Sequence, residues 1–241
     1  EIATADVLAV SVGQQGLTTA IPLIANGLVL RWGQAAPRPL DLIIAENLRN
    51  ASQYFEIELK AMLPDNYPFN QLVGLVETSI GKMVPIMTKK DMEEDILQVV
   101  AEPYNSLILD KKGFKNPVPA IEGLAPKENI KAWVDRKLFI HNLGHATAAY
   151  LGYQYNPGFI YLYEVLAVDS LRKKVKATMM QSAHLLLLRY PADFTLQDLQ
   201  AHIDDLLHRF ANKSLGDTIY RVGCDLKRKL SADDRLAGAI H

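Results

Sequence analysis

The first sixty residues alternate between buried-strand and helical patterns, and this alternation limits the possible folds more than any other feature. Two nearly unbroken apolar runs, Asp6–Val12 (DVLAVSV) and Asp41–Ala45 (DLIIA), are typical of strands buried on both faces of a parallel sheet. Apolar residues at helical spacing follow, over about 18–33 and 48–63. The first helix is expected to begin near residue 18, so that Pro22 falls in its first turn. This order predicts a doubly wound α/β domain.

Such sheets bind ligands beyond the carboxyl ends of their strands, which here are Val12–Gly13 and Glu46–Asn47. A dinucleotide-binding domain also needs a GxGxxG turn and an acidic partner for the ribose, and the sequence contains neither after a strand. The chain is therefore expected to begin inside such a domain, without its first strand–helix–strand unit. The alternative is that the α/β part never bound a nucleotide.

Beyond residue 70, a mixed region is followed by a helical one. Short apolar stretches predict strands at 72–77, 83–87, 96–100 and 107–109, and residues 91–95 form an acidic, solvated segment. The crowding of Pro117, Pro119, Gly123 and Pro126 is typical of a linker. We therefore expect an α/β domain over residues 1–126 and a helical domain over 127–241. The helices expected in the second domain are 128–150, 159–165, 169–189 and 195–211.

The helix that includes Asp135–Tyr150 carries the polar side chains best placed for chemistry. At about 100° per residue, with Lys137 at zero, His141 falls near 40°, His145 near 80° and Asn142 near 140°. These groups share one arc of the helix. The side chains expected to pack on the domain are Phe139, Ile140, Leu143 and Ala146. The small residues expected to leave room over the polar arc are Gly144, Ala148 and Ala149.

Lys137 can act as a general base only if its amine is neutral, which requires its pKa to fall several units from about 10.4. Burial or a nearby cation, such as an oxidised nicotinamide, would lower that pKa. The alternative is an exposed helix lysine, because Asp135 and Arg136 flank it. Asn142 and His145 could donate hydrogen bonds to a substrate oxygen as charge develops, or could serve helix packing.

Three further groups leave alternatives open. His141 and His145 have the HxxxH spacing of zinc ligands, but no glutamate follows the first histidine and no third ligand is evident, so we predict no metal. Asn47 could enter the same pocket or could cap the following helix. Arg221 and Arg235 are candidates to bind a phosphate, because arginine offers a bidentate fork. They belong to a basic cluster that otherwise resembles a solvated surface.

Composition narrows the kind of partner. A chain of 241 residues with 49% apolar and 22% charged residues is typical of a globular protein. The net charge of −1 gives no general attraction to nucleic acid or anionic membranes, and no apolar run is long enough to span a bilayer. A single cysteine, Cys224, fits a reducing cytoplasm, and no segment resembles a signal peptide. We expect a cytoplasmic monomer that acts on a small molecule.

Several stretches together resemble one known family. Lys137, Asn142 and His145 reproduce the KxxxxNxxH signature of the long-chain polyol dehydrogenases, and the surrounding KLFIHNLGHATAAYLGY resembles the bacterial mannitol-1-phosphate 5-dehydrogenases. The resemblance covers essentially the whole chain. Its further matches are SVG at 11–13, AENLRN at 45–50, MVP at 83–85, ILDKKGFKN at 108–116 and RKLSADDRL at 228–236.

The resemblance implies a Rossmann-like α/β domain followed by an all-α helical domain. It also implies an NAD-dependent, zinc-independent oxidoreductase that interconverts mannitol 1-phosphate and fructose 6-phosphate. Lys137 would be the general base, and the residues that orient the substrate oxygen would be Asn142, His145 and Asn47. The residues that would bind NAD are Ser11, Val12, Gly13 and Asn47. The alternatives are a relative that acts on another polyol or a sugar acid, and a non-catalytic domain.

Overall fold

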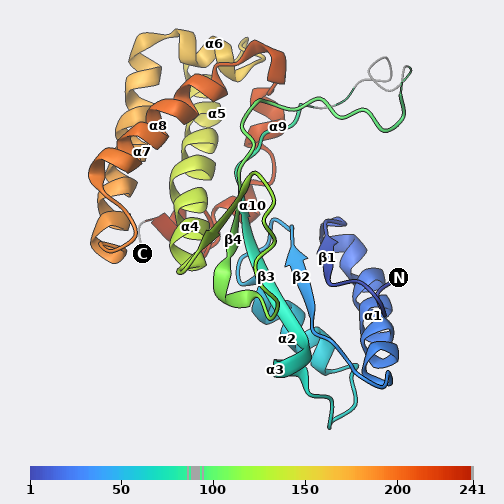
Figure 1. The fold of residues 1–241 in the computed structure, drawn as a ribbon. Coiled ribbons are helices and arrows are strands. Elements are labelled where there is room, and N and C mark those ends of the chain that lie inside the picture. The colour runs from blue at the N-terminus through green and yellow to red at the C-terminus, as the bar shows by residue number, and fades with distance from the viewer. Residues whose placement is uncertain (86, 88–92, 94, 240–241) are drawn as a thin grey trace. The chain divides into compact units, whose positions relative to one another are not determined.

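The computed structural model describes residues 1–85, 87, 93 and 95–239 (Figure 1). Contacts divide the chain into two compact units. The first comprises Glu1–Ile80 and Ser106–Val134, and the second comprises Gly81–Asn105 and Asp135–His241. The first unit holds a β-sheet with helices, and the second is helical, as the sequence predicted.

The first unit is built on a sheet whose described strands lie in the order β1-β2-β3-β4-β5 (Figure 1). The three strands β1, β2 and β3 are parallel, the second half of β3 is antiparallel to β4, and β4 is parallel to β5. Val10 pairs with Ile44, so the carboxyl ends of β1 and β2 meet at one edge of the sheet. The strands are β1 Val7–Val10, β2 Leu40–Ile44, β3 Val73–Ile80, β4 Leu107–Asp110 and β5 Leu124–Lys127.

Helices α1 (Gly13–Trp32) and α2 (Ala51–Lys60) bury their apolar sides against the parallel strands. Leu28 of α1, Phe55 of α2 and Leu42 of β2 are fully buried in this core. Each such side chain contributes about 1.5–3 kcal/mol relative to an exposed one. The remaining helical segments of this unit are α3 Phe69–Leu72 and a 3₁₀ turn at Lys111–Gly113.

The start of α1 differs from the sequence prediction. The helix begins at Gly13 and not near residue 18, so Pro22 lies in its interior. The reason is local: Gly13 adopts φ +72°, and the amides of Val12 and Gly13 donate to the Glu46 carboxylate at 2.6 and 3.0 Å. These bonds satisfy two amides that a helix start leaves without partners. The helix accepts Pro22 although a proline inside a helix removes a hydrogen bond.

A buried carboxylate ties the loop after β4 to the sheet. Asp41 in β2 is fully buried and accepts hydrogen bonds from the amides of Lys115 at 2.7 Å and Asn116 at 3.1 Å. Close approach of the two segments requires glycine, because a Cβ on Gly74 would lie 2.0 Å from Asp41 Oδ1 and 2.7 Å from the Gly113 carbonyl oxygen. The end of the segment ILDKKGFKN is thus held on Asp41 by two main-chain amides and by the side chain of Asn116, whose Nδ2 donates to Asp41 Oδ2 at 2.9 Å.

In the second unit, α7 (Asp169–Arg189) packs against both α5 (Leu143–Tyr155) and α8 (Leu196–Phe210), as Figure 1 shows. The sequence predicts α7 and α8 to within a residue, because Thr195 caps α8 with its side chain and Asp198 completes the capping box. The other helices that end or lie in this unit are α4 Ile130–Arg136, α6 Leu162–Ala167, α9 Ile219–Gly223 and α10 Leu226–Lys229. Short 3₁₀ turns lie at Lys213–Leu215 and Ala237–Ala239.

The segment Gly81–Asn105 joins the helical unit through Arg209 of α8. The guanidinium binds both carboxylate oxygens of Glu102, at 2.5 and 2.8 Å, and the Gly81 carbonyl oxygen at 2.6 Å. Tyr104 lies over the same guanidinium, 4.4 Å from it. Glu102 in turn accepts from the Met83 amide at 2.6 Å. Arg209 and Glu102 are both buried, so this ion pair fixes the segment on α8.

Three details of the sequence interpretation are corrected here. Residues 96–100 form no strand, and their apolar side chains are exposed, with Ile96 at 85%. Of the strand expected at 83–87 and the acidic segment at 91–95, residues 86, 91, 92 and 94 lie outside the described residues, and the described part of 83–87 is not a strand. Pro126 lies in β5 and not in a linker. An edge strand tolerates a proline because it leaves backbone amides on one side without sheet partners.

Candidate active site

A π-helical turn, Lys137–Asn142, separates α4 from α5 and contains the first two signature residues. The Leu143 amide donates to the Leu138 carbonyl, five residues back. Bonds of this type join residues i and i+5, so a π-helical turn rotates less per residue than an α-helix. The angle between Lys137 and Asn142 around the helix axis is therefore smaller than 100° per residue predicts. The helical wheel used for the sequence therefore overstates their separation. Such turns occur frequently at functional sites.

The opposite side of this helix packs into the unit as predicted, because Phe139, Ile140, Leu143 and Ala146 are all buried. The expectation that Gly144, Ala148 and Ala149 leave open space is wrong. Ala148 and Ala149 are fully buried, and a Cβ on Gly144 would lie 2.5 Å from the Met179 Sδ of α7. The small residues therefore allow α5 and α7 to pack closely.

Lys137 is half-buried. Burial, with the positive charge of Arg235 as the second cause, lowers the pKa of Lys137 to about 8. With that pKa, about a tenth of the amine is neutral at pH 7 and about half at pH 8. Lys137 thus has the electrostatic surroundings that a general base requires.

His145 is held by a carboxylate and by an aromatic ring. Its Nε2 lies 3.0 Å from Asp217 Oδ2, and its ring stacks on Phe210 with centroids 4.6 Å apart and planes inclined by 10°. Burial, together with the positive charges of Arg221 and two neighbouring cations, lowers the pKa of His145 to about 3. The imidazole is therefore neutral throughout the physiological pH range.

His141 is buried at 6% exposure and meets the rings of His145 and Phe210 edge-on, with centroids 6.1 and 5.4 Å apart. Burial is the main reason that the pKa of His141 lies well below 6.5. Among the residues that the structure describes, no group of three or more histidine, cysteine, aspartate or glutamate side chains is arranged to hold a metal ion.

Three positively charged side chains from the basic cluster of the sequence, Arg221, Lys229 and Arg235, lower the pKa of His145. Lys229 is 4% exposed and donates to the carbonyl oxygens of Val222, at 2.6 Å, and Cys224. Arg235 is 9% exposed, with its Nε 2.8 Å from Asp234 Oδ1, whereas Arg221 is exposed and pairs with Asp217. We refer to Arg221, Lys229 and Arg235 as the cationic cluster. Two of its members are buried, which the solvated-surface alternative did not anticipate.

In the first unit, Ser11, Val12 and Gly13 follow β1, and Asn47 follows β2 at the same sheet edge. Ser11 and Asn47 are exposed there. Asn47 does not cap the following helix, because Asn50 occupies the N-cap position of α2. Glu46, which binds the amides of Val12 and Gly13, is not among the residues predicted from the sequence. The sequence does contain a clue to this role, because Glu46 is an acidic residue that directly follows the second strand, and the start of a helix attracts negative charge.

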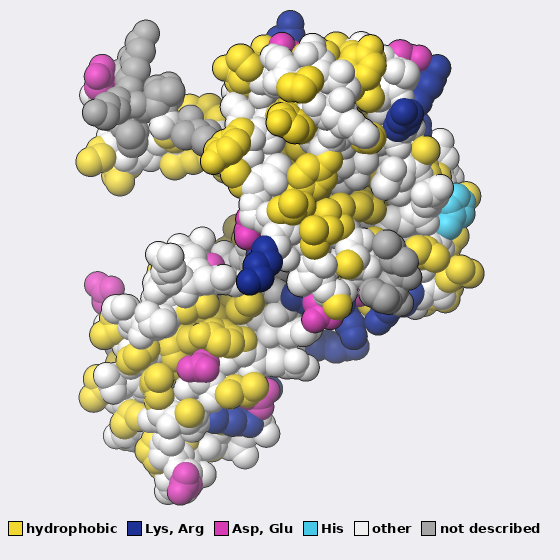
Figure 2. Space-filling view, turned by 180° about the vertical axis from the view of Figure 1, so that it is seen from behind, with side chains coloured by type: hydrophobic (Ala, Val, Ile, Leu, Met, Phe, Trp, Pro, Cys, Tyr) yellow, Lys and Arg dark blue, Asp and Glu magenta, His cyan; other side chains and the backbone are white. Residues whose placement is uncertain are grey.

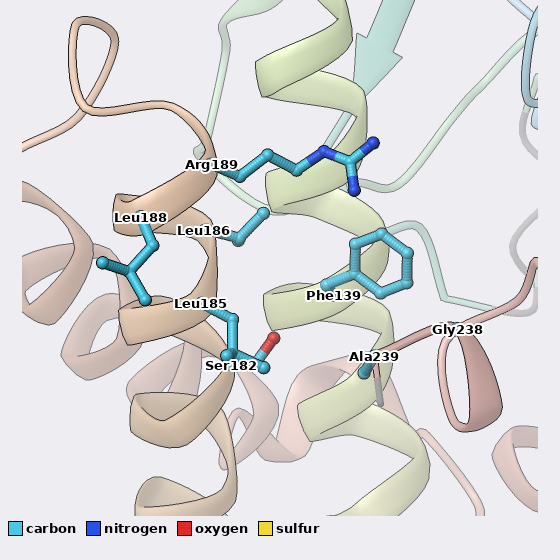
Figure 3. A pocket seen from close by; sticks show the side chains of 8 residues that line it. All are labelled: Phe139, Ser182, Leu185, Leu186, Leu188, Arg189, Gly238 and Ala239. Atoms are coloured by element: carbon cyan, nitrogen blue, oxygen red, sulfur yellow. The ribbon is translucent and has the colours of Figure 1, made fainter. Parts of the chain in front are cut away.

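A separate pocket of about 340 Å³ lies in the helical unit, between the π-helical turn, α7 and the last described residues (Figure 3). Leucines of α7 and Phe139 give it a largely apolar wall, and Arg189 extends across it (Figure 3). Its lining includes none of the residues predicted to perform chemistry. The residues that line it are Phe139, Ser182, Leu185, Leu186, Leu188, Arg189, Gly238 and Ala239.

On the face seen in Figure 2, basic and acidic side chains are scattered among neutral and apolar ones and form no continuous basic stripe. Among the described residues, no helix combines the length and apolar character needed to cross a bilayer.

A Rossmann-like sheet of five described strands is followed along the chain by a helical unit, whose π-helical turn and α5 carry Lys137, Asn142 and His145. Residues 1–123 match the Mannitol dehydrogenase Rossmann domain, and residues 129–241 match the Mannitol dehydrogenase C-terminal domain. The chain therefore belongs to the mannitol dehydrogenase family, whose members are oxidoreductases. The predicted fold class and the polyol dehydrogenase resemblance are confirmed at this level.

Two solved structures share the fold. One is a D-sorbitol dehydrogenase in substrate-free form, with a TM-score of 0.80 and 16% identity over 99% of this chain and 56% of that chain. The other is the Pseudomonas fluorescens mannitol 2-dehydrogenase in a ternary complex with NAD and D-mannitol, with a TM-score of 0.70 and 17% identity over 92% of this chain and 52% of that chain. The chain thus spans about half the length of these structures.

Proposed function

We propose that this chain contributes the catalytic helix of an NAD-dependent dehydrogenase that interconverts D-mannitol 1-phosphate and D-fructose 6-phosphate. The observation that carries the choice of a phosphorylated substrate is the cationic cluster. The positive charges of all three members lower the pKa of His145, and that of Arg235 also lowers the pKa of Lys137. An anionic group bound by these side chains would lie close to the general base.

The chemistry follows from the states of the side chains. NAD, when bound, accepts the hydride that leaves the alcohol carbon. Neutral Lys137 takes the hydroxyl proton on Nζ, and the electron pair of that O–H bond completes the carbonyl group. The amide of Asn142 donates a hydrogen bond to the oxygen that carries the developing charge. Asn47, on the sheet unit, stays a prediction for the same role.

The sheet edge formed by Ser11–Gly13 and Asn47 is the proposed site of NAD. A helix start usually offers its amides to a phosphate, but here the amides of Val12 and Gly13 already bind Glu46. This edge therefore fits the nicotinamide and ribose rather than the pyrophosphate. Ser11 and Asn47 provide the hydroxyl and amide groups for such contacts.

An uncharged polyol is the second candidate substrate. Arg221 pairs with Asp217, and Arg235 pairs with Asp234, so two carboxylates offset much of the charge of the cationic cluster. This pairing favours a hydroxyl group as the partner of these side chains, as in the relatives named for mannitol and sorbitol. The carboxylate of a sugar acid would bind to the cationic cluster in the same way as the phosphate group of a sugar phosphate.

Comparison of substrates tests the proposal. With NADH, kcat/KM for fructose 6-phosphate is expected to exceed that for fructose by about 100-fold or more, since a site built for a charged group rejects analogues that lack it. Arg235→Gln is expected to lower kcat/KM for fructose 6-phosphate by a larger factor than kcat/KM for fructose, because only the phosphate loses a binding partner while both reactions lose the effect of Arg235 on the pKa of Lys137. Arg172→Gln on the exposed side of α7 is the control. Equal rates with fructose and its phosphate would favour the uncharged polyol.

We also propose that the protein is a cytoplasmic monomer. The single cysteine and the scattered surface charge support this assignment. Light scattering of the purified protein tests the oligomeric state, and a mass of two or more chains contradicts it.

A further inference from the structure

Asp217 occupies a fixed and buried position directly before α9. It is 6% exposed, and its carbonyl oxygen accepts from the Leu162 amide at 2.9 Å. The Ile219 amide donates to the Ile160 carbonyl oxygen at 2.8 Å, so main-chain bonds on both sides of Asp217 hold it against the segment that leads into α6. The backbone, and not a flexible loop, thus determines where this carboxylate lies.

The two oxygens of Asp217 have different partners. Oδ2 lies 3.0 Å from His145 Nε2, and Oδ1 pairs with the guanidinium of Arg221, one helical turn further along the chain. A carboxylate that is paired with an arginine can only accept hydrogen bonds. The proton of the His145 ring must therefore be on Nε2.

The neutral state of the His145 ring determines whether Nδ1 can accept a hydrogen bond from a ligand. A neutral imidazole carries one proton, so a proton on Nε2 leaves Nδ1 as an acceptor. Stacking on Phe210 fixes the plane of the ring, and the bond to Asp217 fixes its rotation. This result differs from the sequence expectation, which has His145 as a donor to the substrate oxygen.

We propose that Asp217 is a positioning residue for the dehydrogenase reaction described above: it holds His145 as the Nε2–H tautomer, so that Nδ1 accepts a hydrogen bond from a hydroxyl group of the polyol. This inference rests on the proposed function. Donation to the oxygen that loses its proton then belongs to Asn142, and His145 selects a substrate with a hydroxyl group next to the reacting carbon. Arg221 pairs with Asp217 and so helps to hold that carboxylate beside His145, and its own charge lowers the pKa of His145.

The tautomer can be measured without turnover. In protein labelled with ¹⁵N-histidine, long-range ¹H–¹⁵N correlations distinguish a protonated from an unprotonated ring nitrogen. We expect a protonated Nε2 and an unprotonated Nδ1 for His145 between pH 6 and 8. A protonated Nδ1 or a doubly protonated ring in the wild-type protein would overturn the proposal. A protein that shows the expected tautomer but reduces no ketose contradicts the proposed function and leaves the Asp217 contact standing.

Variants connect the tautomer to the reaction. Asp217→Asn places an NH₂ donor beside Nε2, so the His145 signals should shift toward the Nδ1–H form and kcat/KM should fall about 10- to 100-fold. NADH binding should stay unchanged, and Asp217→Glu, which restores a carboxylate, should recover part of the rate. Asp225→Asn is the matched control, because Asp225 also pairs with an arginine, Arg228, but is exposed. An Asp217→Asn protein with an altered tautomer and an unchanged kcat/KM overturns the positioning role.

Discussion

At the scale of single residues, the proposed chemistry depends on two side chains whose pKa values burial lowers below those of exposed residues of the same type. Lys137 is partly neutral near pH 8, and His145 stays neutral down to about pH 3. The sequence identifies both as candidates, because KxxxxNxxH is a local pattern. It does not reveal Asp217, which lies 72 positions from His145, or the burial of Lys229, because contacts between distant segments leave no periodic signal.

Replacement of Lys137 by alanine tests its role as a general base. We expect turnover to fall by about 10³-fold or more, since general-base catalysis and the correct placement of the proton acceptor are both lost. NADH binding, followed by nicotinamide fluorescence, should change little, because the proposed NAD contacts lie in the other unit. Lys173→Ala is the control, since Lys173 is an exposed lysine that pairs with Asp169. Unchanged turnover in the Lys137→Ala protein would contradict the assignment.

The pH dependence of the reaction follows from the lowered pKa of Lys137. A base must be neutral, so the rate of polyol oxidation should rise with pH, with an apparent pKa near 8, and reach a plateau above it. Ketose reduction needs the protonated amine and should decline over the same range. Initial rates from pH 6 to 10 in both directions measure this. Rates of oxidation that do not change between pH 7 and 9 would show that another group supplies the base.

At the scale of elements, local signals predicted some helices well and could not predict others. The limits of α7 and α8 follow from apolar periodicity and from the capping box at Thr195. The π-helical turn at Lys137–Asn142 has no such signal, because the periodicity used for the sequence assumes 100° per residue throughout the helix. The apolar residues at 96–100 resemble a strand, but a strand also needs a neighbour to pair with.

The glycine in β3 offers a test of the close contact between the sheet and the loop after β4. Gly74→Ala should lower the free energy of unfolding by about 2–4 kcal/mol, because the new Cβ meets the Asp41 carboxylate and a main-chain carbonyl that cannot both move. Denaturant unfolding measures the change. Gly33→Ala is the control: Gly33 has φ −70° and open surroundings, so alanine there should change stability by less than about 1 kcal/mol. Equal effects of both substitutions would contradict the contact.

At the scale of the whole molecule, the chain passes from one compact unit to the other after Ile80, Asn105 and Val134. Prolines and a glycine in the sequence predict a single division at 126/127, and that boundary stays a prediction. Composition cannot show that Gly81–Asn105 belongs with the helices, because the buried pair of Glu102 and Arg209 joins residues 107 positions apart.

This pair predicts the behaviour of a shortened protein. A fragment of residues 127–241 lacks Glu102, so Arg209 loses its buried partner, and such a loss costs about 3–5 kcal/mol. We expect the fragment to unfold at a lower denaturant concentration than the helical unit of the whole protein. A fragment as stable as the whole protein would show that the segment 81–105 contributes nothing to the helices.

Glu102 and Arg209 also affect how such a protein can be recombined. An exchange of the sheet unit between two relatives at one splice point would separate this glutamate from its arginine and combine halves from different parents. A functional hybrid therefore has to carry over the stretch between β3 and β4 together with the helices, which requires joins at three places in the gene. Because the backbone crosses between the units three times, a single join in the gene cannot exchange one whole unit for another.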